Sequence, residues 1–210
     1  MIKVLIADDH PLVREGLKRI LEDSSDIVVA GEASNGQELL KKVRKNDYDV
    51  VLLDISMPGR NGLDVLKQLK IIKPDLHILI LSIFPEELYG VRALKAGASG
   101  YLTKKNTPDE LIMAIKKVSL GRKYINLSLS EKLAFDIEAD SKKPLHERLS
   151  DREYEVMCKI ASGKTVKEIA EELSLAPSTI STHRSHILEK MNMKKNAELT
   201  YYVIKEGLIP

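Results

Sequence analysis

Short apolar runs alternate with amphipathic segments along the first 118 residues of the chain. The runs are rich in valine, isoleucine and leucine and have few polar interruptions, which is typical of parallel strands covered on both faces. They span residues 4–7, 27–30, 50–53, 78–81 and 101–103. Strands that alternate with helices predict a doubly wound α/β domain with a five-stranded parallel sheet.

The segments between these runs carry hydrophobic residues at helical spacing. In the first segment, one face carries Leu12, Gly16, Leu17, Ile20 and Leu21, so we expect this face to pack against the sheet. The last segment opens with Thr107, and Glu110 follows three residues later. This spacing predicts a capping box at the start of the fifth helix.

After residue 149 the pattern becomes helical throughout. Ser150 with Glu153 and Thr165 with Glu168 match two further capping boxes, and Pro177 suits the start of a third helix. A fourth helix is expected from residue 196. The second and third helices, joined by a short turn, match a helix-turn-helix.

The stretch between the two regions is polar and is broken by Pro144. We therefore predict a first domain over residues 1–120, a linker over 121–147 and an all-α four-helix domain over 148–210. A length of 210 residues is comfortable for two domains of modest size.

Composition narrows the class of protein. Hydrophobic residues make up 43% and charged residues 30% of the chain, as in soluble globular proteins. The sequence has no run of about 18 apolar residues and no signal peptide, so we expect a cytoplasmic protein that does not use a membrane. Cys158 is the one cysteine, which excludes an internal disulfide. The net charge of +2 is small, so a nucleic-acid role must rest on local charge placement.

Charged side chains stand at the carboxyl ends of three predicted strands. Asp8 and Asp9 follow the first strand, Asp54 follows the third, and Lys104 follows the fifth. Ligands and reaction chemistry collect at this edge of an open α/β sheet. Carboxylate oxygens alone suit Mg²⁺, and Asp54 could then attack a phosphoryl group, with Lys104 pairing the phosphoryl oxygens.

Alternative roles for these strand-end residues are less consistent with the sequence. Each one alone could be a solvated side chain at a strand end. A dinucleotide site would need a glycine-rich turn after the first strand, and a P-loop motif is absent. A dehalogenase-like phosphatase would need a second aspartate at position 56, where the chain has Ser56.

Residues 1–118 resemble the receiver domain of two-component response regulators, which has a flavodoxin-like fold. The resemblance rests on Asp8-Asp9, Asp54 with Met57-Pro58, Ser82 and the segment 100–104. It implies phosphorylation at Asp54 and a Mg²⁺ site. Asp9 and the Ser56 backbone carbonyl would bind the ion beside Asp54, and Asp8 would act mainly through water. By the same resemblance, Ser82 and Tyr101 are the switch pair and Lys104 is the phosphate partner.

Residues 149–208 resemble the LuxR-type helix-turn-helix domain, through the segments 149–156, 167–170 and 179–183. The resemblance implies binding of double-stranded DNA by the third helix. The residues expected to contact DNA are Ser178, Thr179, Ser181, Thr182, Arg184, Ser185 and Lys190. Ala176, Ser181 and Asn196 depart from common family residues, and the last two changes remove positive charge. Leu199, Tyr202 and Val203 would pair with a second copy or would pack in the interior.

The whole chain thus resembles a response regulator of the NarL/FixJ type. That resemblance implies a transcription regulator that receives its phosphoryl group from a sensor histidine kinase and forms a homodimer on phosphorylation or on DNA. It implies no enzyme activity beyond the chain's own phosphoryl transfer and dephosphorylation. Two alternatives stay open. The chain could bind DNA independently of phosphorylation, or the near-neutral helical domain could bind protein. Steep loss of DNA affinity with salt would argue against the second alternative.

Overall fold

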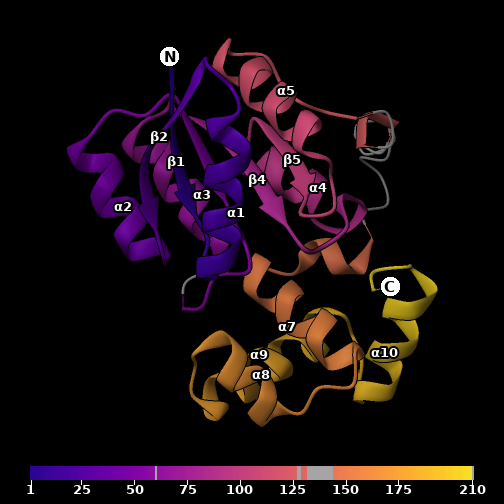
Figure 1. The fold of residues 1–210 in the computed structure, drawn as a ribbon. Helices are drawn as coiled ribbons and strands as arrows, with labels where there is room; N and C mark the ends of the chain where they lie inside the picture. Colours follow the sequence, from indigo (N-terminus) through magenta and orange to yellow (C-terminus); the bar gives the residue numbers. More distant parts are fainter. Residues whose placement is uncertain (60, 127–128, 132–143, 210) are drawn as a thin grey trace. The chain divides into compact units, whose positions relative to one another are not determined.

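The computed structural model describes residues 1–59, 61–126, 129–131 and 144–209. The chain divides into two compact units, Met1–Ala134 and Phe135–Pro210. Figure 1 shows an α/β first unit and an all-helical second unit. Among the helices of the described ranges, none has the length and apolarity that a membrane span requires.

The first unit is built on the predicted five-stranded parallel sheet, which is confirmed. Its strand order is β2-β1-β3-β4-β5. The order places β1 and β3 side by side, so Asp8 and Asp54 leave neighbouring strands. The strands are β1 Ile2–Ala7, β2 Ile27–Ala33, β3 Val50–Leu53, β4 His77–Ser82 and β5 Gly100–Thr103.

Strand β2 is three residues longer than the apolar pattern predicted. Its register with β1 shifts between Val4 and Leu5, so that Leu5 pairs with Gly31 rather than with Ala30. After this shift, β2 continues through the polar Glu32, which still pairs with β1. An apolar run alone could not reveal this extension, because Gly31 and Glu32 are poor strand formers.

Helices pack on both faces of the sheet. Two of them, α1 and α5, share one core cluster with alternate residues of the strands, including Val4, Leu52 and Leu81. The intervening strand residues, such as Leu5 and Val51, point to the opposite face and are also fully buried. The helices are α1 Pro11–Glu22, α2 Gly36–Lys45, α3 Gly62–Ile72, α4 Glu86–Lys95 and α5 Pro108–Ser119.

Local capping signals in the sequence are confirmed, and one packing prediction is wrong. Thr107 and Glu110 form the predicted capping box of α5. Leu12, expected on the buried stripe of α1, is instead 87% exposed. It belongs to the first turn of α1, whereas the buried contacts of that helix come from Leu17 and Leu21 further along.

The second unit contains the four predicted helices and a short preceding turn of 3-10 helix. The left-handed Ser174 ends α8, and α9 follows after a short turn, which confirms the helix-turn-helix. Ile169, Ile180 and Leu199 lie in the interior. The elements are η1 Leu145–Arg148, α7 Asp151–Ala161, α8 Val166–Leu173, α9 Pro177–Lys190 and α10 Asn196–Lys205.

Both ends of the predicted linker, 121–147, belong to the compact units. After α5, Tyr124 forms a bridge with Gly100 at β5, and Leu129 is buried in the first unit. At the other end, His146 Nδ1 lies 3.0 Å from the Tyr202 hydroxyl of α10. The polar composition of the segment did not indicate these contacts, because the partners Gly100 and Tyr202 are distant in the sequence.

Gly62 offers a direct test of packing at the start of α3. A Cβ at this position would lie 2.3 Å from the Ile55 Cα, which is backbone and cannot move aside. We expect Gly62→Ala to lower the free energy of unfolding of the first unit by about 1–3 kcal/mol. Chemical unfolding of the full chain, followed by circular dichroism, measures the change.

The matched control is Gly16→Ala in α1. Nothing lies within 4 Å of a Cβ built on Gly16. This substitution should leave stability unchanged or raise it by up to about 1 kcal/mol, because alanine is the better helix former. Equal effects of the two substitutions would contradict the close contact at Gly62.

Candidate phosphoryl-acceptor site and helix-turn-helix surface

The structure brings the acidic residues and the lysine together at the carboxyl edge of the sheet. Lys104 Nζ lies 2.6 Å from Asp8 Oδ2 and 2.6 Å from Asp54 Oδ2. The two carboxylates are almost fully buried, with 2% and 1% of their surface exposed. One ammonium group therefore bridges two buried carboxylates that come from neighbouring strands.

Backbone hydrogen bonds continue past the strand ends and fix these side chains. The Asp54 amide donates to the Ala7 carbonyl at 2.9 Å, and the Lys104 amide donates to the Ser82 carbonyl at 2.7 Å. Arg14 of α1 donates from Nη1 to the Asp8 carbonyl at 2.7 Å. No sequence pattern pointed to Arg14, because its partner is a backbone oxygen.

Burial and pairing oppose each other at this site. Burial raises the pKa of the Asp54 carboxyl above its usual range, and Lys104 offsets that effect only in part. Burial lowers the pKa of Lys104, but hydrogen bonds to Asp54 and Asp8 outweigh burial and hold that pKa above its usual range. The lysine therefore stays charged, while the Asp54 carboxylate is held in an unfavourable environment.

The acidic cluster has the donor atoms that a small divalent cation needs. Ligand atoms of Asp8, Asp9, His10 and Asp54 all lie within 4.8 Å of one another. Within the described residues, Asp9 Oδ1 is buried and accepts no hydrogen bond. The His10 Nδ1 atom lies 3.1 Å from it but outside hydrogen-bond geometry. A buried carboxylate oxygen without a donor fits an oxygen-preferring cation.

The expected switch residues lie on either side of one loop residue, Phe84. The buried Ser82 accepts a hydrogen bond at Oγ from the Phe84 amide at 3.2 Å. The Tyr101 hydroxyl donates to the Phe84 carbonyl at 3.0 Å. The backbone of Phe84 thus links the two side chains. Sequence reasoning missed it because the contact uses backbone atoms only.

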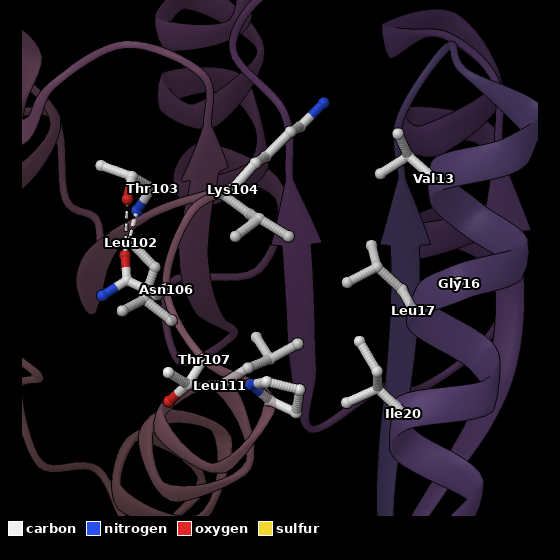
Figure 2. A pocket seen from close by; sticks show the side chains of 12 residues that line it. Val13, Gly16, Leu17, Ile20, Leu102, Thr103, Lys104, Asn106, Thr107 and Leu111 are labelled. Carbon is white, nitrogen blue, oxygen red and sulfur yellow. Dashed lines mark hydrogen bonds between the residues drawn. The ribbon is translucent and has the colours of Figure 1, made fainter.

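A separate apolar cavity of about 180 Å³ lies between α1 and α5. Figure 2 shows Val13, Leu17 and Ile20 of α1 projecting toward the side of the cavity that carries Leu111. Lys104 also lines it, so the cavity borders the acidic site through this one side chain. Its mainly apolar walls do not suit a phosphoryl group.

Five of the seven residues expected to contact DNA are exposed hydroxyls on α9, at Ser178, Thr179, Ser181, Thr182 and Ser185. Three of them donate to carbonyls of their own helix, four residues back. Ser181 Oγ bonds Pro177 at 3.0 Å, Thr182 Oγ1 bonds Ser178 at 3.1 Å, and Ser185 Oγ bonds Ser181 at 3.1 Å. In this arrangement they face an outside partner as acceptors.

The two remaining residues, Arg184 and Lys190, have partners inside the second unit. Arg184 is half-buried, and its Nε donates to Asn196 Oδ1 of α10 at 2.6 Å. Lys190 Nζ lies 2.7 Å from Oε2 of the buried Glu153 on α7. These two side chains join helices of the unit, while Lys190 is also exposed, so their contact with DNA stays a prediction. Their partners are 12 and 37 residues away, beyond any local pattern.

Helix α10 favours interior packing, one of the two predicted alternatives, for two of the three residues. Leu199 and Val203 are fully buried, so they fill the interior of the unit, and Tyr202 is held by His146. The exposed apolar side chains of α10 are instead Tyr201 and Ile204. Spacing alone could not separate the two faces, because both carry large apolar residues.

Comparisons with known proteins agree with both units. Residues 4–116 match the family of response regulator receiver domains. Residues 147–203 match the bacterial regulatory proteins of the luxR family. The chain is 40% identical to the response regulator UvrY of Escherichia coli strain K12 over 209 residues, 99% of this chain and 96% of the relative. It is 35% identical to the response regulator GacA of Pseudomonas aeruginosa, covering 100% and 98% of the two chains.

Solved structures of response regulators are also similar to this chain over nearly its whole length. The chain is similar to RcsB from Salmonella enterica serovar Typhimurium bound to promoter rprA with the phosphomimetic BeF3-. The TM-score is 0.65 at 28% identity, covering 97% of this chain and 98% of that one. It is also similar to a two-component response regulator RcsB–DNA complex, with a TM-score of 0.60 at 29% identity and coverage of 100% and 99%.

Removal of the bridging lysine tests the electrostatics of the acidic site. Lys104→Met leaves two buried carboxylates without their cation, so we expect the free energy of unfolding to fall by about 3–5 kcal/mol. Without Lys104 the pKa of Asp54 rises further in the folded state. The folded state then binds its proton more tightly than the unfolded state, so stability falls as pH rises through that pKa.

The loss of unfolding free energy caused by Lys104→Met should therefore be smaller at about pH 4 than at about pH 7. Urea unfolding at the two pH values, with the exposed neighbour variant Lys105→Met as control, checks this. A deficit that does not depend on pH would contradict the pairing.

The ion pair between Lys190 and Glu153 should stabilise the second unit. Burial raises the pKa of Glu153, but Lys190 and the Ser150 backbone outweigh burial and hold that pKa below its usual range. Because Lys190 is partly exposed, Lys190→Met should lower the free energy of unfolding by about 1–2 kcal/mol. Calorimetry should show no comparable loss for the exposed neighbour variant Lys194→Met, and equal losses would contradict the role of the pair.

Proposed function

Because the chain belongs to the two-component response regulators with a LuxR-type DNA-binding domain, which are phosphorylation-controlled transcription regulators, we propose that Asp54 is its phosphoryl acceptor. A sensor histidine kinase would supply the group. An Asp54 carboxylate oxygen attacks phosphorus, the bond from phosphorus to the kinase histidine nitrogen breaks, and an aspartyl phosphate forms. The observation that carries this proposal is the Lys104 bridge, which sets Asp54 beside the cation that a phosphoryl group needs.

The chain's own residues also account for a magnesium requirement. Asp9, Asp54 and the backbone carbonyl of Ser56 would hold Mg²⁺, and Asp8 would act through water. The ion would offset the charge of the carboxylates and of the incoming phosphoryl oxygens. The buried Asp9 Oδ1 supports this assignment, since within the described residues it accepts no hydrogen bond.

We assign the switch to a change of hydrogen-bond partners. Phosphorylation adds about −1.5 to −2 charge units next to Lys104. Lys104 then turns from Asp8 toward the phosphoryl oxygens. The Ser82 hydroxyl turns away from the Phe84 amide and donates to another phosphoryl oxygen. The Phe84 backbone, which also accepts from the Tyr101 hydroxyl, then loses its hydrogen bond to Ser82.

On the output side, we propose that α9 enters the major groove. Its exposed hydroxyls at Ser178, Thr179, Ser181, Thr182 and Ser185 would accept hydrogen bonds from base amino groups. Arg184 and Lys190, which also bond to other helices of the unit, would contact the DNA as cations. A homodimer would pair through the exposed Tyr201 and Ile204 of α10 and would match two half-sites on the DNA. Because DNA is the target, we expect the protein to act in the cytoplasm.

Replacement of the acceptor tests the proposed function. Asp54→Asn keeps the size of the side chain but removes the nucleophilic carboxylate, so we expect no phosphoryl uptake from acetyl phosphate with Mg²⁺. Intact-protein mass spectrometry should show one added phosphoryl group on the wild-type chain only. The control Asp64→Asn changes an exposed aspartate of α3 and should be labelled normally.

Two further outcomes complete this test. Chelation of the metal should abolish labelling of the wild-type chain. Undiminished labelling of Asp54→Asn would refute the assignment.

A further inference from the structure

The segment after α5 turns back over β5 and α4, and we call its described residues, 122–126 and 129–131, the strap. The Tyr124 amide donates to the Ser99 carbonyl at 2.8 Å, and Tyr124 bridges to Gly100 of β5. Lys123 Nζ donates to the Ala98 carbonyl at 2.5 Å. The strap is therefore attached to the last strand by backbone and side-chain bonds, just before the chain leads on to the second unit.

Two glycines make room for the strap. A Cβ on Gly90 in α4 would lie 2.8 Å from Leu129 Cδ1, and a Cβ on Gly100 would lie 2.7 Å from the Tyr124 carbonyl oxygen. Glycine destabilises a helix interior relative to alanine, so Gly90 is unfavourable for α4 taken alone. Its close contact with Leu129 supplies the reason for a glycine at this position.

The strap also holds the first turn of α4. Asn126 donates from Nδ2 to the carboxylate of the buried Glu86, the first residue of α4. Its Oδ1 accepts from the Leu129 amide at 2.9 Å, and Leu129 is 1% exposed. The residue before α4, Pro85, provides no side-chain cap. Asn126 thus connects the start of α4 to the buried leucine of the strap.

The start of α4 lies next to the expected switch. Phe84, whose backbone bonds both Ser82 and Tyr101, is two residues before Glu86. The Phe84 ring also packs on Tyr89 of α4, with centroids 5.0 Å apart. A continuous set of contacts therefore runs from Ser82 through Phe84 and α4 to Asn126 and Leu129.

We propose that the strap carries the phosphorylation signal from the switch to the linker, by binding α4 in the unphosphorylated state and leaving it on phosphorylation. This inference rests on the proposed function at Asp54. When the Ser82 hydroxyl turns to the phosphoryl group, the Phe84 loop rearranges and moves the first turn of α4. Glu86 and Gly90 then no longer match Asn126 and Leu129, and the strap leaves α4.

Hydrogen exchange in the full wild-type chain tests the release. The amides of Tyr124 and Leu129 are bonded in the unphosphorylated state and should exchange faster after treatment with acetyl phosphate and Mg²⁺. We expect at least about a fivefold increase, the lower end of typical allosteric couplings. Amides of β3 serve as the internal control and should keep their protection.

A matched pair of glycine variants tests the consequence for DNA binding. Gly90→Ala favours the α4 helix, but the added Cβ pushes the Leu129 side chain away from α4. Without phosphodonor, this variant should bind a duplex selected by the wild-type protein at least about fivefold more tightly than wild type does. Gly16→Ala, in open space on α1, should not change that affinity.

The outcomes separate the two levels of the proposal. Labelled Asp54 with unchanged exchange at Tyr124 and Leu129 would overturn the strap mechanism and leave the proposed function intact. Hydrogen exchange could also show that the Leu129 amide has lost its protection in Gly90→Ala. Unchanged DNA affinity of that variant would then overturn the strap mechanism as well. Absence of any label on Asp54 would overturn the proposed function and the strap mechanism together.

Discussion

The bridge from Lys104 to Asp8 and Asp54 is the interaction on which the rest of the first unit depends. It joins β1, β3 and the end of β5 at one edge of the sheet. The ammonium group pairs with Asp8 and Asp54, and a third carboxylate, Asp9, lies in the same cluster, so the site keeps an excess of negative charge. Such a site is stable enough to fold but is ready to accept a cation, and then to exchange carboxylate partners for a phosphoryl group.

A site of this kind is useful only if the chain can report its state elsewhere. The loop around Phe84 provides the first step, since its backbone is bonded both by the Ser82 hydroxyl and by Tyr101. The strap after α5 provides the second step of this transmission, because it packs against α4 and β5. In the second unit, internal ion pairs and buried leucines keep the helices in place and leave the hydroxyl face of α9 free for a partner.

Regular patterns in the sequence predicted the parts of this structure that depend on local chemistry. The five strands, the capping box at Thr107 and the helix-turn-helix followed from periodicity and cap residues. The acidic site followed too, because carboxyl ends of parallel strands meet at one edge. Interactions between distant residues escaped prediction: Lys190 with Glu153, Arg184 with Asn196, and Leu129 against Gly90. The extension of β2 and the exposure of Leu12 also depend on tertiary packing, which a single helical or strand period does not contain.

In the mechanism that we propose, charge on Asp54 controls DNA binding by the second unit. The most direct measurement is the affinity of the full chain for a selected duplex, with and without acetyl phosphate and Mg²⁺, for wild type and Asp54→Asn. We predict that the phosphodonor raises wild-type affinity by about 5- to 150-fold, the range of typical couplings, and leaves Asp54→Asn unchanged. Equal wild-type affinity in both conditions, while Asp54 is phosphorylated, would contradict this mechanism.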